Sequence, residues 1–307
     1  MMKYLIVILL TGILAENPVS ETQKADHPVE SWKVGTYDGI LDGLSLDDLI
    51  SAREKGIHYL ELSINPLLQL GKNERTEWIQ ELKLNTEAAG IQVWSVHMAW
   101  SNTVDISTLN EEDRANTIET HIEVMKLLAP LNVQKYVIHP SAEPVTDEER
   151  SERLQNSINS LKILSKEAQR HSGKIALEVM PRTLLGNTSD ELLYIINEVD
   201  KGLEICFDTN HVLQESPEEF VRKAGSLITT LHVSDYDAVD ERHWMPGRGV
   251  INWNQVIHEL VKIGYEGPWM YEVVRRESDV PVTDIEGLVK TWELLKADYL
   301  NFIEQKD

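Results

Sequence analysis

The chain has 307 residues, of which 42% are hydrophobic and 26% charged, a composition typical of a globular enzyme with a sizeable core. Its 51 acidic residues outnumber its 29 Lys and Arg residues, which gives a formal net charge of −22. Nucleic-acid binding depends on cationic groups that release counterions from phosphates, so this charge argues against a nucleic-acid partner.

The first residues differ from the rest of the chain. Lys3 precedes an apolar run over residues 4–14, and Ala15 leads into a polar stretch. This pattern is typical of a signal peptide, and the run is too short for a stable membrane anchor. We therefore expect a signal peptide over residues 1–15, a polar spacer over residues 16–30, and export to the periplasm or the cell exterior. The alternative is a buried N-terminal strand or helix in a cytoplasmic protein.

From residue 31 to the C-terminus at residue 307, short β-branched or aromatic runs alternate with longer segments of helical spacing. The expected strands are Trp32–Asp38, Tyr59–Asn65, Gln92–Ala99, Lys135–Ser141, Lys174–Met180, Leu203–Thr209, Leu227–Asp235 and Gly267–Val274. The expected helices lie near residues 46–56, 74–90, 111–129, 147–172, 189–199, 216–225, 252–264 and 284–305.

This alternation predicts an α/β fold with a parallel sheet. Eight units over this length predict that the sheet closes into one domain, a (β/α)8 TIM barrel. The alternative is an open doubly wound sheet. It is disfavoured because no glycine-rich turn follows the first expected strand, as it would in a dinucleotide-binding fold.

Polar residues stand at the ends of several expected strands, where a barrel enzyme places its catalytic groups. Glu178 and Glu272 lie between apolar neighbours, and an unpaired buried carboxylate is costly, so each needs a partner. A divalent cation could serve both. Six of the eight expected strands contribute such a residue, namely His97, His139, Glu178, Asp208, His232 and Glu272.

A candidate metal site follows from these positions. Together with Asp208 and His232, the two glutamates form a set of three carboxylates and one imidazole from the last four expected strands. Such a set suits Mn2+, Mg2+, Co2+ or Zn2+, and the residue types do not choose among them. Taken alone, a histidine such as His97 or His139 has the alternative of being a loop residue or a satisfied core residue.

Five segments then occur in a characteristic order. They are Leu177-Glu178-Val179, Phe207-Asp208-Thr209-Asn210-His211, His232-Val233-Ser234-Asp235, residues 241–251 and Tyr271-Glu272-Val273. As an ordered set they resemble the sugar phosphate isomerase/epimerase superfamily, whose members have a xylose isomerase-like TIM barrel. The resemblance extends from about Trp32 to the C-terminus.

The resemblance implies a metal-dependent isomerase or epimerase that acts on a small carbohydrate. In ketose 3-epimerases of this superfamily the histidine three residues after the aspartate contacts substrate, which implicates His211. Those enzymes carry another glutamate where residues 181–183 read Pro-Arg-Thr here, which argues against a free ketohexose as substrate. Their four ligands to one divalent metal correspond in order to Glu178, Asp208, His232 and Glu272.

A second relative with this barrel, endonuclease IV, binds three zinc ions. Its pattern resembles His97, His139, Glu178, Asp208, His211, His232, Glu241, His243 and Glu272, with Glu241 in place of an aspartate. The net charge and the expected export argue against DNA repair, so an endonuclease IV-like phosphodiesterase is a minor alternative. We expect substrate contacts from His97, His139, His211, Glu241, His243 and Arg248.

The expected reaction is proton transfer next to a carbonyl, with Glu178 and Glu272 as catalytic acid and base on opposite faces of the carbon. His211 and Arg248 would hold sugar oxygens. Two other functions stay open, a metal-dependent hydrolase or lyase acting on a glycoside or oxidised sugar, and a non-catalytic sugar-binding barrel. The absence of an obvious Lys/Arg cluster favours an unphosphorylated substrate. The oligomeric state is open, a homo-oligomer included.

Overall fold

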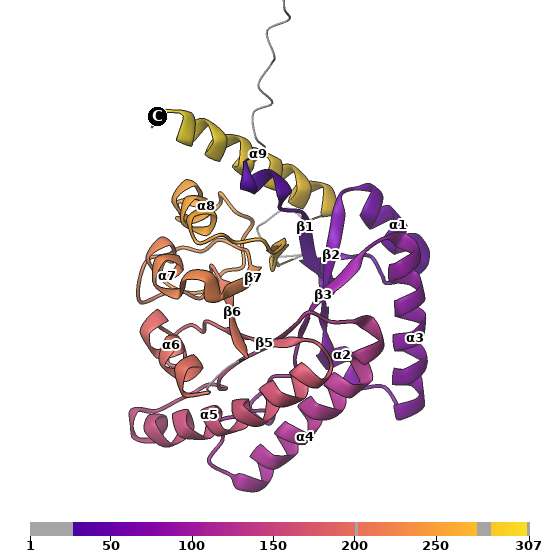
Figure 1. Cartoon of the computed structure of the whole chain (residues 1–307), viewed down its shortest axis with the longest axis vertical. Helices are drawn as coiled ribbons and strands as arrows, with labels where there is room; N and C mark the ends of the chain where they lie inside the picture. Colours follow the sequence, from indigo (N-terminus) through magenta and orange to yellow (C-terminus); the bar gives the residue numbers. More distant parts are fainter. Residues whose placement is uncertain (1–26, 200–201, 275–283, 306–307) are drawn as a thin grey trace, which may run out of the picture.

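A computed structural model describes residues 27–199, 202–274 and 284–305 (Figure 1). The expected signal peptide, residues 1–15, lies outside these residues and stays a prediction. The last residues of the expected spacer belong to the fold, because the 3-10 helix η1 (Pro28–Ser31) buries Val29 completely. Among the helices of the described ranges, none is long and apolar enough to cross a membrane.

Within these residues, eight parallel strands form a nearly closed barrel, which confirms the predicted single (β/α)8 TIM barrel. The strands are β1 (Val34–Tyr37), β2 (Ile57–Ser63), β3 (Gln92–His97), β4 (Lys135–Ile138), β5 (Lys174–Glu178), β6 (Leu203–Asp208), β7 (Ile228–His232) and β8 (Trp269–Tyr271). Their order is β7-β6-β5-β4-β3-β2-β1-β8, so the chain winds once around the barrel. Two backbone hydrogen bonds of Val233, just after β7, join the last strands. Its N–H donates to the carbonyl oxygen of Met270 at 2.8 Å, and its carbonyl oxygen accepts from the N–H of Glu272 at 3.2 Å.

Helices follow the strands and form the outer ring of the barrel (Figure 1). In the described residues they are α1 (Leu46–Glu54), α2 (Ile64–Leu68), α3 (Lys72–Ala89), α4 (Glu111–Leu128), α5 (Asp147–Arg170), α6 (Ser189–Glu198), α7 (Pro217–Ala224), α8 (Trp253–Lys262) and α9 (Ile285–Glu304). The sequence did not reveal α2. Its first residues fall in the run assigned to the second strand, and a short apolar run does not show where a strand becomes a helix.

An aromatic stack packs the C-terminal helix against the barrel. Trp32 precedes β1, Trp269 lies on β8 and Trp292 on α9, and all three are at least 98% buried. The ring centroids of Trp269 and Trp292 are 4.4 Å apart, and Trp32 stacks on both. Trp32 also donates from Nε1 to the carbonyl oxygen of Tyr265 at 2.9 Å. Large aromatic groups dominate core energetics, so this stack anchors α9 across the sheet.

An ion network centred on the buried Glu204 lies at the amino ends of the strands. Lys135 at the start of β4 and Lys174 at the start of β5 both pair with Glu204 on β6, which also accepts a hydrogen bond from Thr229 at 2.7 Å. Burial acts to raise the pKa of Glu204, but Lys135 and Lys174 hold that pKa below its ordinary value. The network therefore belongs to the scaffold, at the end of the barrel opposite the polar strand ends described below.

His121 on α4 gives a pH-dependent contribution to stability that can be tested. Burial lowers the pKa of His121 to about 4, and its Nδ1 lies 2.8 Å from the carbonyl oxygen of Thr117. Because the unfolded pKa is about 6.5, the stabilising contribution is fully present above that pH and is lost as the pH falls toward the folded pKa. When the pH is lowered from about 7.5 to about 5, the free energy of unfolding of wild type should fall by about 2 kcal/mol more than that of His121→Leu. Urea unfolding at both pH values measures the difference, and equal losses would contradict this interpretation.

Candidate metal centre and substrate cavity

A cavity of about 420 Å³ opens at the carboxyl ends of the strands. This is the end at which barrel enzymes place their active sites, and the volume is in the range of small-molecule sites. Asp208 and His232 lie beneath the cavity and are completely buried. The lining includes most of the residues predicted from sequence, namely His97, His139, Glu178, His211, Glu241, His243 and Glu272.

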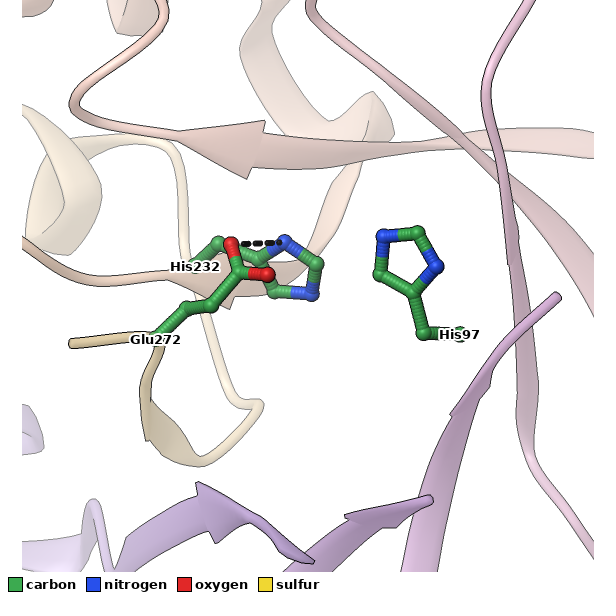
Figure 2. Close-up of side chains that lie close together, drawn as sticks. All are labelled: His97, His232 and Glu272. Carbon is green, nitrogen blue, oxygen red and sulfur yellow. Dashed lines mark ion pairs between the residues drawn. The ribbon is translucent and has the colours of Figure 1, made fainter. Parts of the chain in front are cut away.

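Four side chains meet at the base of the cavity. Glu178, Asp208 and His232 are the last residues of β5, β6 and β7, and Glu272 directly follows β8. One candidate ligand atom from each lies within 4.8 Å of the other three. Figure 2 shows the Glu272 carboxylate paired with His232, at 3.0 Å between Oε2 and Nδ1, with the His97 ring beside them. The structure thus brings together the four residues expected to hold the metal.

The carboxylates of this cluster fit a metal ion. Within the described residues, Oε2 of Glu178, Oδ2 of Asp208 and Oε2 of Glu272 are buried and make no hydrogen bond. Histidine nitrogens lie close, with Nε2 of His139 at 3.0 Å from Glu178 Oε2, but without hydrogen-bond geometry. Buried carboxylate oxygens need compensation, and coordination of a divalent cation would provide it.

His97 forms a group of ligand type with His232 and Glu272 of this cluster, and two further groups flank it. His97 and His139 approach Oε2 of Glu178 through their Nε2 atoms, at 3.4 and 3.0 Å. On the other side, Nε2 of His211 lies 3.0 Å from Oε2 of Glu241, and His243 completes a second group. Glu178 belongs both to the four-residue cluster and to the pair of histidines, so it occupies the centre of the whole arrangement.

The buried charges shift one another's pKa values. Burial acts to raise the pKa of Glu178, but His232 and His139 hold it well below its ordinary value. The pKa of Glu272 is likewise lowered, against burial, mainly by His232. Burial raises the pKa of Asp208 to about 7. His211 acts to lower this pKa, and the negative charge of Glu272 acts to raise it. Nearby positive charge therefore holds the two glutamates in the ionised form, whereas burial works against the ionised form of Asp208, which a bound cation would favour.

Asp235 organises the loop between β7 and α8. Its carboxylate accepts hydrogen bonds from the backbone nitrogens of Gly247 at 2.8 Å and Ile251 at 3.2 Å, and from Nε1 of Trp253 at 3.0 Å. A Cβ atom at Gly249 would come within 2.2 Å of the same carboxylate, so this close approach requires glycine. The loop that carries Glu241 and His243 is therefore fixed by hydrogen bonds from Asp235 near its start to residues near its end.

Asn210, just after β6, sets the backbone of that loop at the cavity. Its Oδ1 accepts hydrogen bonds from the backbone nitrogens of Arg242 at 2.7 Å and His243 at 3.2 Å. The φ of His243 is 49°, a left-handed conformation that non-glycine residues rarely adopt. Asn210 belongs to the motif at residues 207–211, but its position in the sequence does not indicate this role.

Glu61 is a buried residue of the site that the sequence analysis missed. It lies on β2 with 1% exposure, accepts a hydrogen bond from Oγ of Ser95 at 2.6 Å, and contacts Nε2 of His232 at 2.9 Å. The sequence did contain a signal for Glu61, because this acidic residue lies between Leu60 and Leu62. The same placement in an apolar run singled out Glu178 and Glu272.

Arg248 does not take the position expected of it. It is exposed in the loop between β7 and α8 and does not contribute to the described cavity lining, so its position does not support a contact with sugar oxygens. Arg182 lines the cavity instead and forms ion pairs with Asp240 at 3.2 Å and with Glu241. These two partners belong to the loop that Asp235 organises, and Arg182 also lies 3.7 Å from Glu143 in the loop after β4, so it joins loops at the mouth.

The chain matches the family described as the xylose isomerase-like TIM barrel over residues 49–297 and belongs to that family. An uncharacterized protein of Methanocaldococcus jannaschii is 32% identical over 69% of this chain and 71% of its own length. The D-psicose 3-epimerase of Ruminiclostridium cellulolyticum is 26% identical over 71% of this chain and 74% of its own length. The crystal structure of a D-tagatose 3-epimerase-like protein superposes with a TM-score of 0.72 at 27% identity, covering 89% of this chain and 99% of that one. Relatives of this chain thus include sugar epimerases.

Proposed function

We propose that this protein is a divalent-metal-dependent sugar isomerase or epimerase that transfers a proton at the carbon next to a carbonyl. The observation that supports this most is the cluster of Glu178, Asp208, His232 and Glu272, in which one buried oxygen of each carboxylate lacks a hydrogen bond within the described structure. The D-psicose 3-epimerase among the relatives supports the class of reaction.

The four clustered residues would hold the metal, and their oxygen-rich set with one imidazole suits Mn2+, Mg2+, Co2+ or Zn2+. When bound, the metal supplies Lewis acidity that lowers the cost of negative charge developing on the substrate oxygens. Glu178 and Glu272 also line the cavity, so each can contact a substrate as well as a cation.

The two glutamates are the proposed proton carriers. They enter the cavity from β5 and from the segment after β8, so each can reach a bound substrate from its own side. One carboxylate takes the proton from one face of the carbon. The other, after receiving a proton from solvent, delivers that proton to the opposite face, and the first then releases the abstracted proton to solvent. This sequence of steps leaves a solvent-derived hydrogen in the product.

Other lining residues are proposed to hold the substrate. The four histidines His97, His139, His211 and His243 present polar ring atoms around the cavity and suit sugar hydroxyls. Trp100 is 52% exposed at the mouth, with its ring centroid 5.2 Å from that of His139. Its apolar face is therefore available to a sugar ring.

The charge of the cavity favours an unphosphorylated carbohydrate. Glu143, Glu178, Glu241 and Glu272 all line it, and Arg182 at the mouth is already paired with acidic side chains. A phosphate would meet this negative charge without a free lining arginine to bind it, since the described pairs engage Arg182.

The test is proton exchange with solvent. Unphosphorylated keto-sugars are incubated with the metal-loaded protein in D2O, and the mixture is followed by NMR. We expect an epimer or isomer that carries deuterium at the carbon next to the carbonyl. If one of these sugars is converted to product without incorporation of deuterium, proton exchange through these carboxylates is contradicted.

A second candidate is metal-assisted hydrolysis or elimination on a glycoside or an oxidised sugar. The two flanking groups, His97-His139-Glu178 and His211-Glu241-His243, favour it, because several metals together activate water well. Release of an aglycone or of an unsaturated sugar would identify this chemistry. An endonuclease IV-like phosphodiesterase would use the same groups, but the net charge of −22 opposes a nucleic-acid substrate.

A further inference from the structure

Glu61 contacts the proposed metal site from below. It lies on β2, is 1% exposed, and does not line the cavity in the described structure. Both carboxylate oxygens face Nε2 of His232, at 2.9 Å from Oε1 and 3.1 Å from Oε2, although the two residues are 171 positions apart in sequence. Ser95 on β3 donates a hydrogen bond to Oε2 at 2.6 Å. The carboxylate is thus held on one side and aimed at His232.

The two ring nitrogens of His232 have different surroundings. Nε2 faces Glu61, whereas Nδ1 lies 3.2 Å from Glu178 and 3.0 Å from Glu272. An ionised carboxylate accepts hydrogen bonds and donates none, so without a cation either ring nitrogen can donate, Nε2 to Glu61 and Nδ1 to Glu178. A metal at the cluster needs a ring lone pair, and Nδ1 is the nitrogen that faces the cluster. Nε2 then keeps its hydrogen for Glu61.

We propose that Glu61 is a positioning residue that fixes the tautomer and ring orientation of His232, so that Nδ1 is presented to the metal. This inference rests on the proposed function, because it needs a metal at the cluster. Carboxylates that hydrogen-bond a ligand histidine orient the ring and raise its basicity as a ligand. Since Glu61 does not reach the cavity, it acts only through His232.

Metal affinity of Glu61→Gln tests the proposal. Glutamine keeps the size of the side chain but removes the charge and one of the two accepting oxygens. Titration of the metal-depleted full chain with Co2+, in competition with a chromogenic chelator, should give a dissociation constant about 10- to 100-fold above that of wild type. An unchanged dissociation constant would overturn the proposal.

Glu204→Gln is the matched control. Glu204 is also a buried glutamate of a barrel strand, but its partners are Lys135 and Lys174 at the opposite end of the barrel. We expect this variant to unfold at a lower temperature and to bind Co2+ as wild type does. Equal weakening of Co2+ binding in both variants would assign the effect to general destabilisation and overturn the role of Glu61.

A measurement on wild type keeps the proposal testable even if Glu61→Gln does not fold. With 113Cd2+ as the probe and isotope-labelled histidine, coupling between the metal and Nδ1 of His232 supports the proposal. Coupling to Nε2 overturns it, because that nitrogen then has no hydrogen to donate to Glu61. A wild-type chain that binds neither Co2+ nor Cd2+ would overturn the proposed function itself, which separates that failure from a failure at Glu61.

Discussion

Replacing Glu178 or Glu272 by Gln should reduce kcat by about 1,000-fold or more, because each change removes a proton-transferring group as well as a metal-type ligand. Both residues line the cavity and belong to the four-residue cluster, so neither loss is compensated by a neighbour in the same position. Steady-state kinetics on the keto-sugar that shows deuterium exchange would measure the effect.

The fold should survive both substitutions. Glutamine has nearly the volume of glutamate and still accepts a hydrogen bond, so the packing around the end of β5 and the end of β8 is retained. Far-UV circular dichroism and the midpoint of thermal unfolding check this. Glu259→Gln on α8 is a suitable control, because Glu259 is buried but pairs with Arg222 and Lys262 outside the cavity. Activity retained after either catalytic substitution would refute the proton-transfer mechanism.

Removing divalent metal should abolish activity, and adding it back should restore activity. Coordination would satisfy the buried oxygens of Glu178, Asp208 and Glu272, so metal should also raise the midpoint of thermal unfolding. A ligand present at about 100 times its dissociation constant stabilises by about 2.7 kcal/mol. Dialysis against a chelator, followed by titration with Mn2+, Co2+, Mg2+ and Zn2+, provides both readouts.

Metal content of the purified protein separates the two candidate functions. One metal per chain, lost in Glu272→Gln, would support a single site at the four-residue cluster. About three zinc ions per chain would instead fill the flanking histidine groups as well and favour the hydrolytic candidate. If no metal binds under any loading condition, the carboxylates must be compensated in another way and the metal-dependent proposal fails.

The barrel was predictable because its determinants are local and repeat along the chain. Each strand is a short apolar run and most helices have their own periodicity, so eight alternating units could be counted without tertiary information. The limit of this reasoning is visible at α2 (Ile64–Leu68), which begins directly where β2 ends. Buried apolar residues occur on both sides of that boundary, so their pattern does not mark the change from strand to helix.

The four clustered residues were also predictable, for a physical reason. A carboxylate inside an apolar run is conspicuous, and the carboxyl ends of parallel strands meet at one end of a barrel. Glu61 meets the same criterion, but it was not predicted because only residues at the ends of strands were considered, and Glu61 lies within β2 (Ile57–Ser63). The role of Arg248 stays a prediction from its motif, because the residue is exposed and does not line the described cavity.

The sequence by itself thus determined the strand and helix order and the residue types gathered at the strand ends, because these depend on neighbours a few positions apart. Only the tertiary structure decided the contact between Glu61 and His232, the pairing of Arg182 with the loop after β7, and the anchoring of that loop by Asp235. The first two contacts join residues from different strands and loops, and closure of the barrel sets their distances and directions. The third joins two parts of one loop that the chain brings together by folding back on itself.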